Sequence, residues 1–105
     1  MSITKKKMPE TLYRASRCCR ILGNPTAYLI VKDLGKKKKT PTQISRDLEL
    51  NLSTVSRTLR HLREIDIVRY ETAGGVREYW IKDYKVFAIL NSLEKLVENI
   101  RKKKI

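Results

Sequence analysis

Residues 51–63 combine short hydroxyl side chains and arginines in a pattern suited to contacting a nucleic acid. The segment reads Asn-Leu-Ser-Thr-Val-Ser-Arg-Thr-Leu-Arg-His-Leu-Arg and contains no acidic residue. As a helix capped by Asn51, it places Val55, Leu59 and Leu62 on one buried stripe at i, i+4 and i+7. The other face carries Ser53, Thr54, Ser56, Arg57 and Arg60. Hydroxyls and guanidinium groups can hydrogen-bond base edges or phosphates, so the pattern predicts a helix lying in a polyanionic groove.

The segment before it predicts a shorter helix that would hold the polar helix in position. Thr40 is a favoured capping residue, and Pro41 suits the first helical position. Ile44 and Leu48 would form the inner face of this helix, and Leu50 would continue the packing in the turn. A turn of this length joins the two helices as a helix-turn-helix.

A β-hairpin is expected directly after the polar helix. Two β-rich runs, 67–72 and 76–81, are separated by Ala-Gly-Gly, and glycine readily takes the positive φ of a tight turn. The alternation of the second strand favours Tyr79 as a core residue. Arg69 and Arg77 are expected to flank the glycine tip, where they could reach a phosphate or a minor groove.

Helix-turn-helix followed by hairpin is the winged-helix arrangement, and the chain resembles the ArsR-like winged-helix transcription regulators. The resemblance covers roughly residues 10–100, and its most specific part is the Thr-Val-Ser-Arg-x-Leu-x-x-Leu core that begins at Thr54. The motifs that carry it are Leu-Gly-Asn-Pro-Thr at 22–26, Gln-Ile-Ser-Arg-Asp-Leu at 43–48, Ser-Thr-Val-Ser-Arg-Thr-Leu-Arg-His-Leu at 53–62, Ile-Val-Arg at 67–69 and Arg-Glu-Tyr-Trp-Ile at 77–81.

The resemblance implies a mainly α fold with a small β-hairpin (α+β), in which a winged helix-turn-helix is followed by a C-terminal dimerisation helix. It implies a dimer that binds double-stranded DNA, with helix 52–63 in the major groove and the wing, 67–81, on the backbone or minor groove. Residues expected to contact DNA are Lys38, Lys39, Thr42, Gln43, Ser53, Thr54, Ser56, Arg57, Arg60, Arg69 and Arg77.

The charge of the chain supports a polyanionic partner. Twenty-four Lys and Arg against eleven Asp and Glu give a net charge of +13 and a pI near 10.1. Nucleic acid is favoured over an acidic membrane surface because the basic residues lie in a helix-turn-helix frame. No apolar run approaches the ~18 residues of a membrane span, so a cytoplasmic, nucleoid-associated protein is expected. Abundant Lys, Ile and Leu also favour a heat-adapted source.

The N-terminal part is expected to hold a disordered basic tail, 1–8, followed by two helices. The first runs from Pro9-Glu10 to about Leu22, and the second, capped by Asn24, covers 26–34. Leu12, Ala15, Cys19 and Leu22 are spaced as a buried stripe, which makes Cys19 a core residue and leaves Cys18 exposed or at a dimer seam. Residues 9–105 are treated as one domain.

The last helix, 84–103, is expected to be capped by Asp83 and to form a dimer. Apolar residues recur along it at the 4–3–4–3 spacing of a coiled-coil seam. They exceed what a small protomer can cover, although packing within the protomer is the alternative. The seam residues are Val86, Leu90, Leu93, Val97 and Ile100.

Other chemistries have little support in the sequence. Cys18 and Cys19 are adjacent and His61 is the single histidine, which is no zinc-site spacing. The ArsR-like metal sensors often carry Cys-x-Cys on the first helix of the helix-turn-helix, but residues 42–48 have no cysteine. No metal, cofactor, small-molecule ligand or enzyme activity is therefore expected. A sequence-specific regulator, an architectural DNA-binding protein, an RNA- or protein-binding module and an intersubunit Cys18 disulfide stay open.

Overall fold

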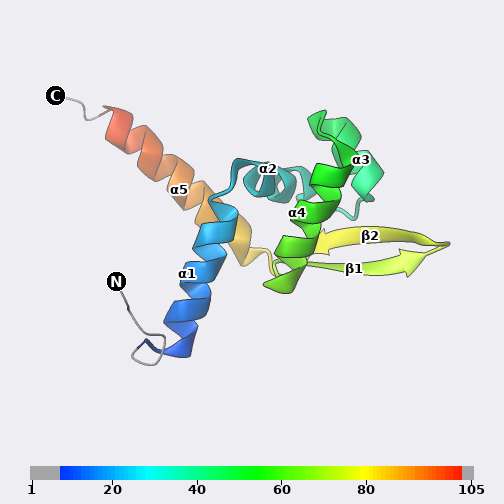
Figure 1. The fold of residues 1–105 in the computed structure, drawn as a ribbon. Helices are drawn as coiled ribbons and strands as arrows, with labels where there is room; N and C mark the ends of the chain where they lie inside the picture. The colour runs from blue at the N-terminus through cyan, green and yellow to red at the C-terminus, as the bar shows by residue number, and fades with distance from the viewer. Residues whose placement is uncertain (1–7, 103–105) are drawn as a thin grey trace.

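The computed structural model describes residues 8–102, which form five helices and one hairpin. The predicted mainly α fold with a hairpin is confirmed (Figure 1). Expectations for residues 1–7 and for Lys103 lie outside the described range. The elements are α1 (Glu10–Leu22), α2 (Pro25–Leu34), α3 (Pro41–Leu48), α4 (Leu52–Glu64), β1 (Val68–Ala73), β2 (Val76–Ile81) and α5 (Lys85–Lys102).

Side-chain caps set the starts of the last four helices, as the sequence predicts, whereas α1 has no side-chain cap. The Asn24 side chain accepts hydrogen bonds from two backbone N–H groups at the start of α2, and Asn51 accepts one at the start of α4. Thr40 and Gln43 form a reciprocal capping box at the start of α3. The Asp83 carboxylate accepts from the N–H of Lys85. Each such cap is typically worth about 1 kcal/mol and fixes where the chain enters a helix.

The core surrounds one side of α2, which buries Ala27, Ile30, Val31 and Leu34 and leaves Leu29 exposed. The predicted stripe of α4, Val55, Leu59 and Leu62, is fully buried against it, and α3 contributes Ile44. Burial of one such aliphatic side chain is worth about 1.5–3 kcal/mol. Other core residues are Leu22, Ala27, Ile30, Val31, Leu34, Val68, Tyr79, Ile81, Val86 and Leu90.

The wing is a two-stranded antiparallel hairpin that extends away from the helices (Figure 1). Gly74 and Gly75 form its tip with φ values of 60° and 79°, a region that favours glycine. The loop before α3 pairs with the outer edge of β2, since Lys39 and Tyr79 exchange backbone hydrogen bonds of 3.0 and 2.8 Å. Tyr79 is only 3% exposed, which confirms it as a core residue.

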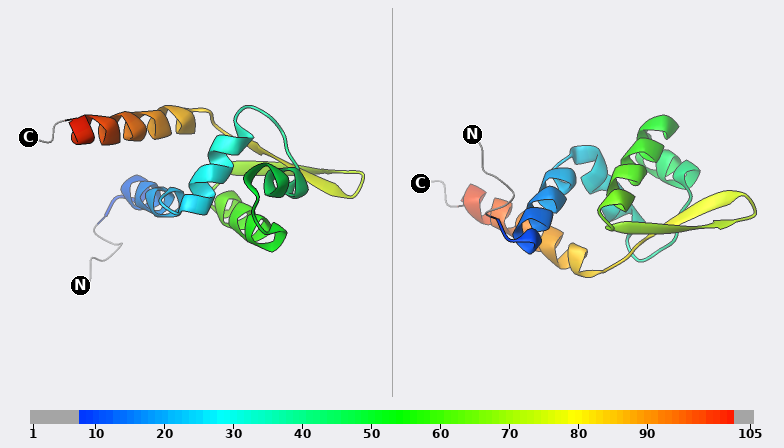
Figure 2. Two further views of the ribbon diagram at one scale, coloured as in Figure 1. Left: turned by 90° about the horizontal axis from the view of Figure 1, so that it is seen from above. Right: turned by 60° about the horizontal axis from the view of Figure 1, so that its bottom comes forward.

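The stripe predicted on α1 is wrong for most of its length. Leu12 is 55% exposed and Cys19 is exposed, whereas Cys18 packs against the core and burial raises the pKa of its thiol. The reason is geometric, because α1 docks through its last turn at Leu22, while the rest of the helix projects from the body on the same side as α5 (Figure 2). Correct helical spacing therefore identified a stripe that the protomer itself does not cover.

The last helix is anchored to α2 by its first half. Val86 and Leu90 are buried in the protomer core, so the exposed part of the predicted seam begins at Leu93. Tyr28 donates a 2.6 Å hydrogen bond to Glu94, which also pairs with Lys32 at 2.9 Å. The bond to Glu94 raises the pKa of Tyr28 to about 12 and, with Lys32, lowers that of Glu94. This polar cluster fixes α5 on α2 just before the helix leaves the body.

Candidate nucleic-acid interface

The outward face of α4 is polar and lies between two hollows. Burial of the apolar stripe leaves Ser53, Arg57 and Arg60 exposed and Thr54 and Ser56 half-buried. The Ser53 hydroxyl donates to Asn51 at 2.6 Å, so it also serves the helix cap. The buried stripe fixes how α4 is turned about its axis, and α4 therefore presents both hydroxyl and guanidinium donors on its outward face.

Arg57 and Arg60, the arginines expected to contact bases, line different hollows. One hollow of 310 Å³, on the side of α1 and α2, is lined by Arg57 together with Arg20, Thr54 and His61. The other, of 320 Å³, separates α4 from the wing and is lined by Arg60. Arg57 and Arg60 are neighbours on the surface of α4 but line different hollows.

The wing arginines lie on opposite faces of the hairpin, which corrects their predicted placement. Arg77 pairs with Thr72 close to the tip, and its guanidinium carbon lies 4.4 Å from the centre of the Tyr70 ring, on the side of α4. Arg69 pairs with Trp80 near the base of the wing, and alternation turns it to the other face. Arg77 lines the hollow that the wing shares with Ser56 and Arg60 of α4, whereas Arg69 lines a different hollow that also contains Glu64 and Asp66.

The two lysines expected to clamp a backbone are engaged within the protein. Lys38 forms a 2.9 Å ion pair with Glu71 and lies over the Trp80 ring. Lys39 is 18% exposed at its side chain and lies 2.8 Å from Asp47 and 3.2 Å from Asp33. These partners, chiefly Asp47, raise the pKa of Lys39. The lysine–carboxylate cluster argues against the expected contact between Lys39 and DNA.

Two further predicted residues lie at the start of α3. Thr42 is exposed there. The Gln43 side chain accepts the backbone N–H of Thr40 at 2.8 Å, which commits one of its polar atoms to the capping box. Gln43 keeps its amide N–H donors for an outside partner.

Sequence reasoning missed Arg63 and Tyr70 as parts of this surface. Arg63 continues the i, i+4, i+7 series of Ser56 and Arg60, so its spacing could have identified it. Tyr70 is not among the residues that the sequence predicts to contact DNA. Its position opposite Tyr79 became clear only from the strand register, with ring centres 5.2 Å apart.

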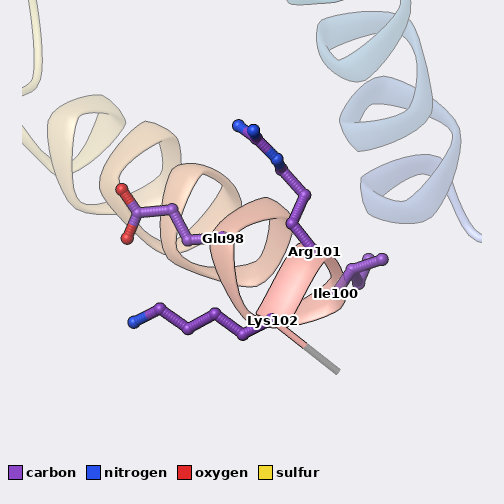
Figure 3. A pocket seen from close by; sticks show the side chains of 4 residues that line it. All are labelled: Glu98, Ile100, Arg101 and Lys102. Atoms are coloured by element: carbon purple, nitrogen blue, oxygen red, sulfur yellow. The ribbon is translucent and has the colours of Figure 1, made fainter. Parts of the chain in front are cut away.

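The other hollows of the described residues are less suited to a polyanion. The hollow lined by Arg63, Arg69 and Tyr70 also contains Glu64 and Asp66. At the end of α5, Glu98, Ile100, Arg101 and Lys102 spread away from one another (Figure 3). Within residues 8–102, no three potential metal ligands cluster. No helix in that range has the length and apolar character that a membrane crossing requires.

Comparisons with known proteins agree with this geometry. Residues 22–71 match the model of the family described as helix-turn-helix domain. The homodimeric winged helix-turn-helix DNA-binding domain of Mb0332 from Mycobacterium bovis, a possible ArsR-family transcriptional regulator, has a TM-score of 0.74 and 22% identity, covering 100% of this chain and 96% of that one. Rv0081 of M. tuberculosis has a TM-score of 0.78 and 19% identity, covering 93% and 98%.

BigR, a transcriptional repressor from Xylella fastidiosa, has a TM-score of 0.74 and 19% identity, covering 90% of this chain and 96% of that one. A search of curated proteins gives no significant match. The chain thus has the winged helix-turn-helix fold of DNA-binding transcription regulators. The resemblance to ArsR-like regulators carried by its motifs is confirmed in the order and arrangement of its elements.

The lysine–carboxylate cluster predicts a pH-dependent loss of stability in Lys39→Met. Without the ammonium group, Asp33 and Asp47 repel each other at about pH 7, whereas most of this repulsion disappears near pH 3, where carboxyls take up protons. Burial raises the pKa of Asp33, and in the wild type the hydrogen bond from Lys39 lowers that of Asp47. The stabilisation through Asp47 is therefore present above the ordinary aspartate pKa and is lost as pH falls. Urea unfolding of the wild type and Lys39→Met across this pH range measures their free energies of unfolding. The variant should be less stable by an amount that shrinks toward acid pH, and a difference independent of pH would contradict the role of these charges.

Proposed function

We propose that this chain is a homodimeric winged-helix protein that binds double-stranded DNA as a sequence-specific transcription regulator. The observation that carries the proposal is the outward face of α4, which presents hydroxyls and arginines between two arginine-lined hollows and has no acidic residue before Glu64 at its end. The fold shared with Mb0332 and BigR supports it. We propose that it acts in the cytoplasm, on the nucleoid. We propose no catalytic role, cofactor or small-molecule ligand.

In this proposal α4 enters the major groove and the wing contacts the backbone or minor groove. An α-helix fits the width of the major groove, where guanine presents acceptors that an arginine can contact with two hydrogen bonds. Arg69 is assigned no contact, because it lies near the base of the wing and lines a hollow that also contains Glu64 and Asp66. The proposed contacts are Thr42, Gln43, Ser53, Thr54, Ser56, Arg57, Arg60 and Arg77.

The second copy of the chain is proposed to cover the projecting helices α1 and α5. Leu93 is 45% exposed and Ile100 is 62% exposed, and Ile89, Leu96 and Val97 are exposed beside them. A hollow of 670 Å³ between α1 and α5 is lined mainly by apolar side chains, including Cys19 and Leu93. Apolar surface of this extent on a small protein indicates an interaction site, and a two-fold dimer would present two copies of α4 to one duplex.

Leu93→Arg should therefore yield folded monomers. The substitution would bury an unpaired charge at the proposed interface, whereas the protomer core is spared because Leu93 is partly exposed. Sedimentation equilibrium measures the oligomeric state, and circular dichroism verifies folding. Asn91→Arg, at an exposed position about 200° away around α5, is the matched control and should remain dimeric. A folded Leu93→Arg dimer would rule out this seam.

Arg57→Ala should lose sequence preference more than overall affinity. Loss of a bidentate guanine contact costs about 1–3 kcal/mol of discrimination. Binding is measured at fixed salt on a duplex selected from a random pool and on a scrambled duplex of the same composition. We expect at least roughly tenfold weaker binding to the selected site and little change on the scrambled one. An equal loss on both would make Arg57 a phosphate contact and would favour an architectural protein with little specificity.

A further inference from the structure

The hollow between α4 and the wing has the composition of an anion site. Its seven lining residues include three arginines, two tyrosines and a serine, but no acidic residue. Within residues 8–102, none of these arginines forms an ion pair in the structure. The lining residues are Pro41, Ser56, Arg60, Arg63, Tyr70, Arg77 and Tyr79.

Two of these arginines are held against the same aromatic ring. The guanidinium carbon of Arg77 lies 4.4 Å from the Tyr70 ring centre, and that of Arg63 lies 5.1 Å from it. Each gains from the negative face of the ring, but two like charges collected at one ring repel each other. An anion between them would remove that repulsion, whereas a neutral or cationic ligand would not.

The wall of the hollow also supplies hydroxyl groups. Arg77 donates a 3.4 Å hydrogen bond to the Tyr79 hydroxyl oxygen, which leaves the hydroxyl hydrogen for another acceptor. Tyr79 is held rigidly, because it is buried and its backbone pairs with both β1 and Lys39. Ser56 lies on the α4 side of the same hollow. Guanidinium forks together with hydroxyl donors match the several oxygens of a phosphate.

We propose that this hollow binds one phosphate group, namely a backbone phosphodiester of the duplex whose major groove α4 enters. The inference rests on the proposed function. Arg63 and Arg77 act as the two charged arms, and Tyr79 and Ser56 supply further hydrogen bonds. Because one arm comes from α4 and the other from β2, a phosphate seated here sets the angle between helix and wing on the DNA.

The first arm of the test uses the full chain and a random-sequence duplex. Each neutralised phosphate contributes roughly 0.9 to the slope of log K against log salt. Arg63→Gln and Arg77→Gln should each make the slope shallower by about 0.9 and weaken binding about tenfold at low salt. Arg17→Gln removes the same charge from an exposed position on α1 and should leave the slope unchanged. Wild-type slopes in the Arg63 and Arg77 variants would overturn the proposal.

The second arm titrates the DNA-free protein with inorganic phosphate at constant ionic strength, followed by amide chemical shifts. Saturable shifts at Ser56 and Tyr79 that vanish in Arg63→Gln support the site with free phosphate as ligand, while a slope change without such shifts supports the phosphodiester alone. If the wild type binds no duplex, the proposed function fails by itself. In that case the shifts caused by inorganic phosphate test whether the hollow binds an anion, and their absence overturns the inference as well.

Discussion

Burial of one side of α4 is the constraint on which the rest of this structure depends. Val55, Leu59 and Leu62 are fully buried, and each contributes about 1.5–3 kcal/mol through removal from water. Turning α4 about its axis would expose this stripe, at a cost comparable to the whole stability of a small domain. The packing of α2 and α3 therefore decides which side chains of α4 face outward.

The ion pairs lie on the elements that support α4. Carboxylates that pair with lysines lie on the supporting elements: Asp33 and Asp47 with Lys39, Glu71 with Lys38, and Glu94 with Lys32. Among the described residues, the arginines of α4 and the tip of the wing have no such carboxylate. The outward face of α4 and the tip of the wing therefore keep their positive charge uncompensated, as do basic residues elsewhere such as Arg17 on α1. A net charge of +13 spread evenly would give no preferred face for a polyanion.

Much of the fold could be predicted because its signals are local. Asn24, Thr40 and Asn51 cap helices through residues two or three positions away, and the stripe of α4 follows from its own spacing. The positions of Arg69 and Arg77 could not be read in this way. Both are close to the glycines in sequence, but strand register and alternation place them at different heights and on opposite faces.

Errors of another kind arose where the covering partner is distant in the chain. The spacing of α1 cannot tell whether Cys18 or Cys19 meets the core, since that depends on how the helix docks. Likewise Val86 and Leu90 belong to the seam pattern of α5 but are covered by the protomer itself. The expected contact of Lys39 with DNA failed for the same reason, because its partners Asp33 and Asp47 lie on two different helices.

The central claim is that α4 reads bases from the major groove, and methylation interference on a selected duplex tests it most directly. Guanine N7 faces the major groove and adenine N3 faces the minor groove, so methyl groups at these atoms block the two grooves separately. The account predicts that N7-methylation of guanines within each half-site prevents binding, while N3-methylation of adenines at the same positions is tolerated. Binding that is indifferent to guanine N7-methylation throughout the site would contradict it.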